Sequence, residues 1–241
     1  MTARKTITTA IRDFAEQRAY FSIGDLREYL RQSKIVFAEN SVKMTVARLK
    51  RENVIFSAGR GFYSILKDMV SLETEKLEPL KQLLVEKYPF LPFTIWSTSQ
   101  IAFAYHHIPV VHPTLICSEK DALSGVKDYL NSKGFLAFDN PSKQEIEKYF
   151  QVESNTIVLR PSVTRQKDQD YFATIEAILV DLYIESQKLF LMDMAEFQRI
   201  LKYFITHYRL NLSYFFDYAD RRKIKQEMMQ LVKMYTNATL A

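Results

Sequence analysis

Residues 41–65 read "SVKMTVARLKRENVIFSAGRGFYSI", a basic segment with helical spacing followed by an arginine between two glycines. The chain has only five glycines, and Gly59 and Gly61 flank Arg60. Glycine adopts positive φ without a steric clash at Cβ. The apolar segments 53–57 and 62–65 predict two strands. We therefore expect a hairpin that presents Arg60 at its tip, with glycines that allow a tight turn and a close approach to a ligand.

The first part of this stretch predicts a helix with one basic face. At 3.6 residues per turn, Val42, Val46 and Leu49 share an apolar face. We place this helix at residues 42–52, with Asn40 and Ser41 as its N-terminal caps. The opposite face carries Lys43, Met44, Ala47, Arg48 and Arg51.

Two further helices precede it. Apolar residues with helical spacing predict a helix over 6–18, and Ser22 is a good N-cap for a second. Three helices followed by a hairpin is the order of a winged helix-turn-helix, so we assign residues 1–70 to such a DNA-binding domain. The third helix would enter the major groove and the hairpin would be the wing. The candidate DNA-binding residues are Ser41, Lys43, Met44, Arg48, Lys50, Arg51 and Arg60.

Within that set we expect two kinds of contact. Lys43 and Arg48 are predicted to reach base edges, which carry sequence information. Arg60 is predicted to contact the phosphate backbone, which positions a protein on any sequence. The alternative is that the module binds another protein and that its basic face is merely solvated.

The positive charge is concentrated in the same region. Residues 1–70 hold 13 Lys and Arg against 7 Asp and Glu, whereas residues 71–241 hold 20 against 21. Such asymmetry indicates a polyanionic partner for one domain only.

Composition restricts the class of protein. The chain has 241 residues, of which 47% are hydrophobic, so we expect a globular protein with a sizeable core. A single cysteine, Cys117, excludes an internal disulfide and a multi-cysteine zinc site. No apolar run approaches membrane-spanning length, and the first residues lack a signal-peptide core. These features predict a cytoplasmic protein.

Residues 71–241 are expected to form a larger mixed α/β domain that ends in a helical bundle. Strand and helix patterns alternate up to about residue 170, which is typical of an α/β layer. The fold class is therefore α+β or α/β. The expected strands are 93–97, 114–118, 135–138 and 156–160; the expected helices are 79–87, 98–107, 120–134, 142–150, 174–186, 194–208, 212–219 and 221–235.

Residues that could carry chemistry are better explained by structure. His106, His107 and His112 lie close in sequence, but adjacent histidines on a helix point about 100° apart and rarely share a metal. We interpret them as surface or capping residues and Cys117 as a core residue. Glu119 and Asp121 lie near a helix start, where acids favour the helix dipole. No phosphate loop, dinucleotide fingerprint or nucleophile elbow occurs, so we expect no enzymatic activity, no metal and no cofactor.

Asp181 interrupts the apolar run "AILVDLYI". A carboxylate in such a segment needs a partner. Arg221 and Arg222 are the candidate partners.

Four motifs recur in one order in a known family: "GRGFYSI" (59–65), "FTIWSTS" (93–99), "TIEAILVDL" (174–182) and "YADRR" (218–222). On these motifs the chain resembles AbiEi-type antitoxins of the type IV toxin–antitoxin, abortive-infection systems. The likeness covers most of the chain but does not extend to residues 100–155. It implies the antitoxin-domain motif residues Thr174, Glu176, Asp181, Tyr218, Arg221 and Arg222.

The resemblance implies two activities. The winged helix would bind the promoter of its own operon and repress it. The C-terminal domain, 71–241, would counter a nucleotidyltransferase-like toxin, without requiring a stable complex with it.

Two other classes remain open. One is a winged-helix transcription regulator whose C-terminal domain binds a small ligand or a protein. The other, ranked last, is a nuclease tethered to DNA, because "TIVLRPS" lacks the acid-x-Lys strand that a restriction-type nuclease needs.

Overall fold

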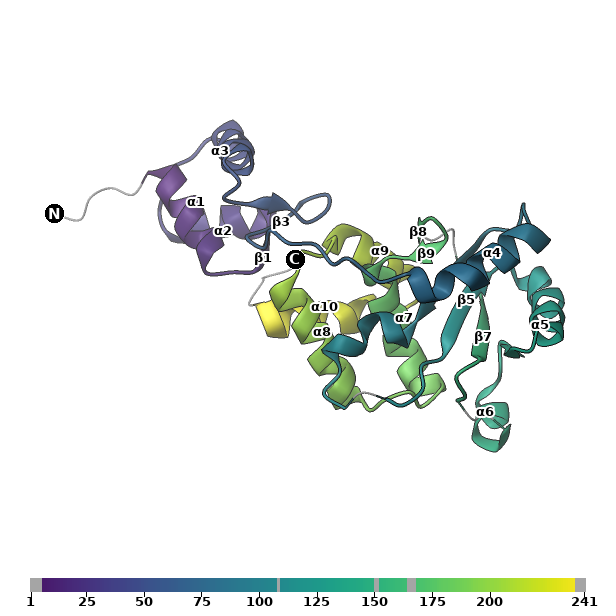
Figure 1. Cartoon of the computed structure of the whole chain (residues 1–241). Helices are drawn as coiled ribbons and strands as arrows, with labels where there is room; N and C mark the ends of the chain where they lie inside the picture. Colours follow the sequence, from purple (N-terminus) through teal and green to yellow (C-terminus); the bar gives the residue numbers. More distant parts are fainter. Residues whose placement is uncertain (1–5, 108, 150–151, 164–167, 237–241) are drawn as a thin grey trace. The chain divides into compact units, whose positions relative to one another are not determined.

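The computed structural model describes residues 6–107, 109–149, 152–163 and 168–236 (Figure 1). It divides into two compact units. Unit 1 comprises residues 1–70 and 201–241, and unit 2 comprises residues 71–200. The break after residue 70 coincides with the predicted domain boundary, whereas residues 201–241 group with the N-terminal residues and not with the rest of the predicted C-terminal domain.

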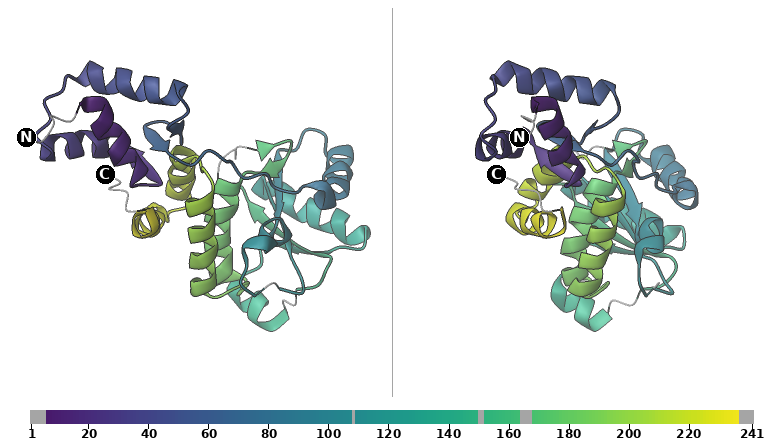
Figure 2. Two further views of the ribbon diagram at one scale, coloured as in Figure 1. Left: turned by 60° about the vertical axis from the view of Figure 1, so that its left-hand side comes forward. Right: turned by 90° about the vertical axis from the view of Figure 1, so that its left-hand side faces the viewer.

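The N-terminal part of unit 1 contains three helices and a small antiparallel sheet. The helices are α1 (Ile7–Glu16), α2 (Ile23–Gln32) and α3 (Glu39–Arg51). The sheet has the order β1-β3-β2, with β1 (Tyr20–Ser22), β2 (Phe56–Ser57) and β3 (Phe62–Ser64). Figure 2 shows α1, α2 and α3 in purple and blue, with α1 packed against both other helices. The hairpin was expected from the sequence, but strand β1 was not.

Of the two helix caps predicted in this part, the cap of α2 is confirmed and the cap of α3 is not. Ser22 caps α2 as expected: its Oγ accepts a hydrogen bond from the Asp25 backbone N–H at 3.0 Å, and the Asp25 carboxylate accepts one from the Ser22 N–H at 2.6 Å. The predicted caps of α3, Asn40 and Ser41, are wrong. Helix α3 already begins at Glu39, so both residues lie in its first turn, and its N-cap has no side-chain hydrogen bond.

The C-terminal part of unit 1 contains α9 (Leu212–Arg221), α10 (Lys225–Thr236) and the end of α8 (Met194–His207). The buried Tyr20 hydroxyl donates to the Tyr208 carbonyl at 2.6 Å and accepts from the Leu210 N–H at 2.8 Å. The Leu212 N–H donates to the Ala58 carbonyl at 2.8 Å. These contacts are the physical reason why residues 201–241 group with the first 70 residues.

Unit 2 is built on a six-stranded mixed sheet of order β6-β7-β5-β4-β9-β8. Strands β5, β6 and β7 are parallel to one another; β4 is antiparallel to β5 and parallel to β9, and β8 is antiparallel to β9. The short strands β8 and β9 were not expected from the sequence. The strands are β4 (Phe93–Ser97), β5 (Thr114–Ser118), β6 (Leu136–Asp139), β7 (Thr156–Pro161), β8 (Asp168–Gln169) and β9 (Phe172–Ala173).

Helices cover this sheet on both faces. Apolar residues of α4 (Glu78–Lys87) and α5 (Leu123–Ser132) pack in one core cluster with Ile95, Ile116 and Ile157 from alternate strand positions. Helix α7 (Ile175–Lys188) covers the opposite face (Figure 1). A further helix, α6, spans Lys143–Tyr149.

Three 3₁₀ helices complete unit 2. They are η1 (Glu75–Leu77), η2 (Thr98–Ala104) and η3 (Lys120–Ala122). The α-helix predicted over 98–107 is thus a 3₁₀ helix. Across the described part of the chain, no helix combines the length and the apolar character that crossing a membrane requires.

Candidate functional site

The outward face of α3 carries free positive charge. Val42, Val46 and Leu49 are buried, as their spacing predicted. The residues predicted for the opposite face are exposed, and Met44 is 72% exposed. Within the described residues, Lys43, Lys50 and Arg51 form no ion pair. The basic face of α3 therefore presents cations that the protein itself does not neutralise.

Arg48 differs from these cations. Its Nη2 donates a hydrogen bond to the Thr8 hydroxyl of α1, and its Nε lies 3.8 Å from Glu52 Oε1. The other oxygen of Glu52 lies 3.8 Å from Arg12 Nη2, again on α1. At about 100° per residue, Arg51 lies near the middle of the outward face, Arg48 about 60° from it, and Lys43 and Lys50 farther round the helix. In this structure Arg48 therefore contacts α1 and Glu52, and its predicted contact with base edges, shared with Lys43, stays a prediction.

The two glycines at the hairpin tip have different surroundings. Both have positive φ, +100° for Gly59 and +83° for Gly61. A Cβ on Gly61 would meet nothing within 4 Å, whereas one on Gly59 would lie 2.8 Å from the backbone nitrogen of Ser213. The expectation that both glycines let the hairpin approach DNA is therefore wrong for Gly59, because the start of α9 occupies its open side. Arg60, between them, is exposed.

Aromatic contacts extend this attachment of the hairpin. The Phe62 and Phe216 rings lie 5.9 Å apart, centroid to centroid. The Arg209 guanidinium lies 4.9 Å from the centroid of the Phe56 ring. Residues 209–216 thus contact the hairpin, whereas Arg60 at its tip is exposed.

The antitoxin-domain motif residues lie in two units. Thr174, Glu176 and Asp181 belong to unit 2, where the two acids are buried in α7. Tyr218, Arg221 and Arg222 belong to unit 1, at the C-terminal end of α9. Of these six, Arg221 is exposed, Tyr218 is buried, and Thr174 and Arg222 are half-buried. A pairing of Asp181 with Arg221 or Arg222 would join the two units and stays a prediction.

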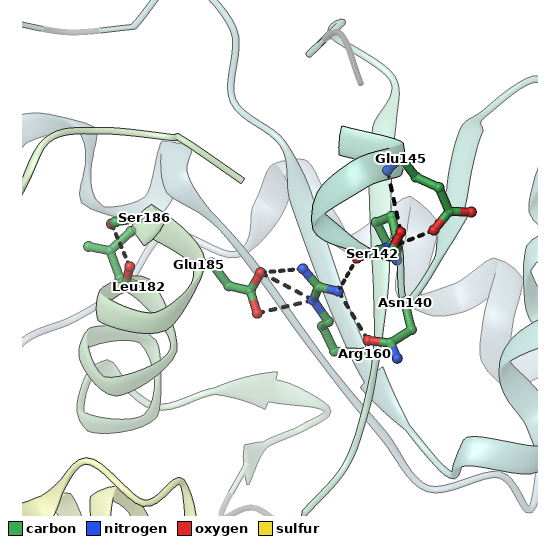
Figure 3. A network of polar contacts seen from close by, with 8 residues as sticks. Asn140, Ser142, Glu145, Arg160, Leu182, Glu185 and Ser186 are labelled. Atoms are coloured by element: carbon green, nitrogen blue, oxygen red, sulfur yellow. Dashed lines mark hydrogen bonds and ion pairs between the residues drawn. The ribbon is translucent and has the colours of Figure 1, made fainter. Parts of the chain in front are cut away.

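A buried arginine network in unit 2 was missed by the sequence analysis (Figure 3). Arg160 of β7 donates through Nη2 to Glu185 Oε2 at 2.7 Å and through Nε to both Glu185 oxygens at 3.1 Å. Its Nη1 donates to Asn140 Oδ1 at 3.0 Å and to the Pro141 carbonyl at 3.2 Å. The side chains of Arg160 and Glu185 are 5% and 1% exposed. The pair joins the sheet to α7, and all three guanidinium nitrogens donate within it, so this is a structural site.

A signal for this pair was present in the sequence. Glu185 lies on the same apolar helix as Asp181, and Arg160 is the charged residue in the apolar strand "TIVLR". Each pattern predicts a buried charge that needs a partner.

Two of the three histidines, His106 and His107, contact each other instead of pointing apart, and His112 has a different partner. His106 Nδ1 lies 3.0 Å from His107 Nε2, both on exposed side chains. His112 Nδ1 lies 3.0 Å from the Thr98 hydroxyl, and burial, followed by the nearby Lys76 charge, lowers the pKa of His112. Cys117 is buried in β5. Among the described residues, no group of three or more His, Cys, Asp or Glu side chains could hold a metal ion.

Comparison with known proteins gives a family but no activity. Curated proteins yielded no match. Residues 41–238 match DUF6577, which is described as a family of unknown function. Because this match covers most of the chain, from α3 to the last described helix, the protein belongs to the DUF6577 family.

Proposed function

We propose that the protein binds double-stranded DNA through residues 6–65, folded as a winged helix-turn-helix with α3 in the major groove and the β2–β3 hairpin as the wing. One observation carries the proposal: Lys43, Lys50 and Arg51 are exposed on the outward face of α3 without an ion pair among the described residues. Exposed Arg60 follows at the hairpin tip. Cations of this kind release counterions when they meet DNA phosphates, which drives binding.

The residues of α3 suggest a division of contacts. Arg51 is central on the outward face and is suited to the O6 and N7 acceptors of guanine. Met44 and Ala47 are exposed apolar neighbours that suit the thymine methyl group. Lys43, which the sequence alone placed at base edges, flanks this row together with Lys50, and both suit phosphates, as does Arg60 on the wing. Ser41, in the first turn of α3, can donate to a phosphate or a base edge.

In the cell, we propose that this chain is a cytoplasmic antitoxin and repressor of its own operon, and that it counters a nucleotidyltransferase-like toxin without a stable complex. The support is the order of the four motifs. Because Glu176, Asp181 and Tyr218 are buried, they would maintain the fold, and Arg221 is the motif residue placed to contact a partner.

DNA binding is tested on the full chain with a double variant, Lys43→Ala/Arg51→Ala. Fluorescence anisotropy would measure its affinity for the DNA upstream of its own gene and for a scrambled duplex. We expect a loss of about tenfold or more on the upstream DNA, and a decrease of roughly one in the slope of log K against log salt, because Lys43 is the phosphate-facing cation of the pair and Arg51 faces a guanine edge.

A matched control removes two exposed lysines of unit 2, Lys120→Ala/Lys188→Ala. It should bind both duplexes as the unmodified chain does. Equal losses in the two double variants would show that only net charge matters and would contradict the proposed interface.

The antitoxin role is tested by co-expression with a nucleotidyltransferase-like protein encoded beside this gene. The full chain should restore growth, and Lys43→Ala/Arg51→Ala should still protect while losing repression. Loss of protection in this DNA-binding variant would contradict separate sites for the two activities.

A further inference from the structure

Unit 2 contains a cavity of about 950 Å³ at one edge of its sheet. Phe93, Ser118 and Pro161 pair in one row across β4, β5 and β7. The chain leaves the parallel strands β5 and β7 at this row, and the next residues, Glu119 and Ser162, line the cavity. Sheets with parallel strands bind ligands outside the carboxyl ends of those strands. The volume also lies in the range of small-molecule sites, roughly 300–1,000 Å³.

Aromatic and apolar side chains form much of the lining. The Phe93 and Tyr171 rings are stacked, with centroids 4.6 Å apart. Phe90 lines the cavity and is 97% exposed, although burial of such a ring is favourable. Leu91, Pro92 and Val163 extend this apolar surface. A ligand with an apolar body would cover side chains that the chain leaves open to solvent.

The charged side chains in the described part of the cavity lining are acidic. Glu119, Asp168 and Asp170 line it, and none of the described lining residues is a lysine or an arginine. Asp170 is already paired, because its Oδ2 lies 2.6 Å from Lys81 Nζ. Glu119 caps a 3₁₀ helix through its backbone with no side-chain hydrogen bond. Asp168 accepts one backbone hydrogen bond, from Tyr171 at 3.2 Å. Glu119 and Asp168 therefore have no cation of their own among the described residues.

Lys81 shows how this region holds an ammonium group. Its Nζ lies 2.6 Å from both Glu78 Oε1 and Asp170 Oδ2, and 5.3 Å from the centroid of the Phe172 ring. Carboxylates and an aromatic face together are the surroundings that stabilise an organic cation.

The turn that carries Asp170 and Tyr171 has an unfavourable backbone. Both residues have positive φ, 56° and 70°, in the two-residue connection between β8 and β9. Such turns favour glycine and asparagine, and a bulky residue there is rare. The Lys81 ion pair and the stacking on Phe93 hold this turn, which keeps an acid and a ring at the cavity.

We propose that this cavity binds an organic amine of the polyamine class, with its ammonium groups at Glu119 and Asp168 and its methylene stem against Phe90 and Tyr171. The inference is independent of the proposed DNA binding, which depends on α3 in unit 1. It adds a small-molecule site to unit 2.

The test is isothermal titration calorimetry on the full chain at constant ionic strength. The probes are putrescine and spermidine, with 1,4-butanediol as a neutral compound of similar length. We expect both amines to bind and the diol not to bind. Glu119→Gln/Asp168→Asn should weaken amine binding at least tenfold. Phe90→Ala should weaken it by a few-fold, as expected for an exposed cation–π contact.

A control of equal charge change is Glu86→Gln/Asp128→Asn, on the exposed surfaces of α4 and α5 outside the cavity lining. It should retain amine affinity within about twofold, because cation–carboxylate attraction is short-ranged in salt. A similar loss of amine affinity in both double variants would show that amines are attracted by the overall negative charge, and would overturn the proposed site. Failure of both amines to bind at millimolar concentration would overturn the proposal.

A second measurement does not depend on variants. Hydrogen exchange of the unmodified chain with saturating spermidine should show added protection in residues 89–94, 118–119 and 168–172. Protection restricted to other segments would overturn the assignment even if calorimetry detects binding. Because DNA affinity is measured with Lys43→Ala/Arg51→Ala, failure of either proposal is distinguishable from failure of the other.

Discussion

Arg51 and Arg160 carry the same charge in opposite surroundings. Arg51 lies on the outward face of α3, exposed and without an ion pair among the described residues. Arg160 lies in β7 with its side chain 5% exposed, and its three guanidinium nitrogens all donate to Glu185, Asn140 or Pro141. Each guanidinium nitrogen of Arg160 is thus already engaged by a partner within the protein. Arg160 therefore has a structural role, whereas Arg51 is exposed and open to the DNA contact proposed above.

The energetic reason is the cost of removing a charge from water. A buried guanidinium is tolerated only with a carboxylate and further acceptors in good geometry. An exposed one keeps its hydration, and surface ion pairs contribute only about 0–1 kcal/mol. Substitutions in the two places should therefore change different measurements.

The largest effect is expected from Glu185→Gln. Because it leaves Arg160 buried without its counter-charge, we expect a loss of about 3–5 kcal/mol in the free energy of unfolding. Urea or guanidinium unfolding would measure it. DNA affinity, at a temperature where the variant is folded, should not change.

Glu86→Gln is the control, since surface changes usually stay within about 0.5 kcal/mol. A second variant, Arg160→Met/Glu185→Leu, removes both charges and should recover most of the stability. A Glu185→Gln loss below about 1 kcal/mol would show that the buried pair is not structural.

The next effect separates the two hairpin glycines. Gly59→Ala places a Cβ against Asn211 and Ser213 as well as straining a positive φ, so we expect a loss of about 2–4 kcal/mol. Gly61→Ala strains φ alone, in open space, and should cost about 1 kcal/mol. Thermal melts of the two variants provide the comparison, and equal melting temperatures would contradict the contact between the hairpin and α9.

These two cases show where sequence reasoning stops. Local patterns predicted the apolar face of α3 and the Ser22 cap, because spacing and cap chemistry act within a few residues. They could not indicate what meets Gly59, since Asn211 lies about 150 residues further along the chain. For the same reason they indicated one buried acid in α7, Asp181, but neither Glu185 nor its partner Arg160.

The sequence analysis missed the short strands and the start of α3 for another reason. Strands β8 and β9 have two residues each, too few for a periodic signal. Asn40 and Ser41 are good caps, but the helix begins at Glu39, whose carboxylate lies 2.6 Å from Arg27 of α2, a contact that no local pattern indicates.

A smaller effect is expected within α3 itself, on binding rather than stability. Arg51→Ala should reduce the affinity for the upstream DNA by about 1–3 kcal/mol if it contacts a guanine edge. Arg48→Ala should reduce it less, because Arg48 already contacts Thr8 and Glu52. Fluorescence anisotropy titrations of both variants would show which substitution reduces the DNA affinity more. A larger loss for Arg48→Ala would mean that Arg48 leaves α1 on binding and contacts base edges, as the sequence analysis predicted for it and Lys43.

The smallest effect concerns His112. This side chain is half-buried, so its surroundings are intermediate between those of exposed Arg51 and buried Arg160. Burial and then the Lys76 charge lower its pKa from the ordinary value of 6.5, so the folded state favours the neutral ring. The unfolded state then binds the proton more readily, and this contribution to stability is complete above about pH 6.5. It declines as the pH falls from 6.5 towards the lowered pKa, and below that it changes no further. The neighbouring Tyr105, whose own pKa is raised first by burial and then by the Glu196 charge, stays neutral throughout.

Replacing His112 isolates its contribution to the pH dependence of stability. Asn can still hydrogen-bond the Thr98 hydroxyl but does not titrate, so His112→Asn should flatten the decline in unfolding free energy between about pH 7 and about pH 5. Urea unfolding at several pH values would measure the slope. His207→Asn, at an exposed histidine of α8, is the matched control and should leave most of the slope in place. If His112→Asn retains the full slope while His207→Asn removes it, the acid sensitivity comes from the exposed surface. Partial burial without a counter-charge would then have no measurable cost at this position.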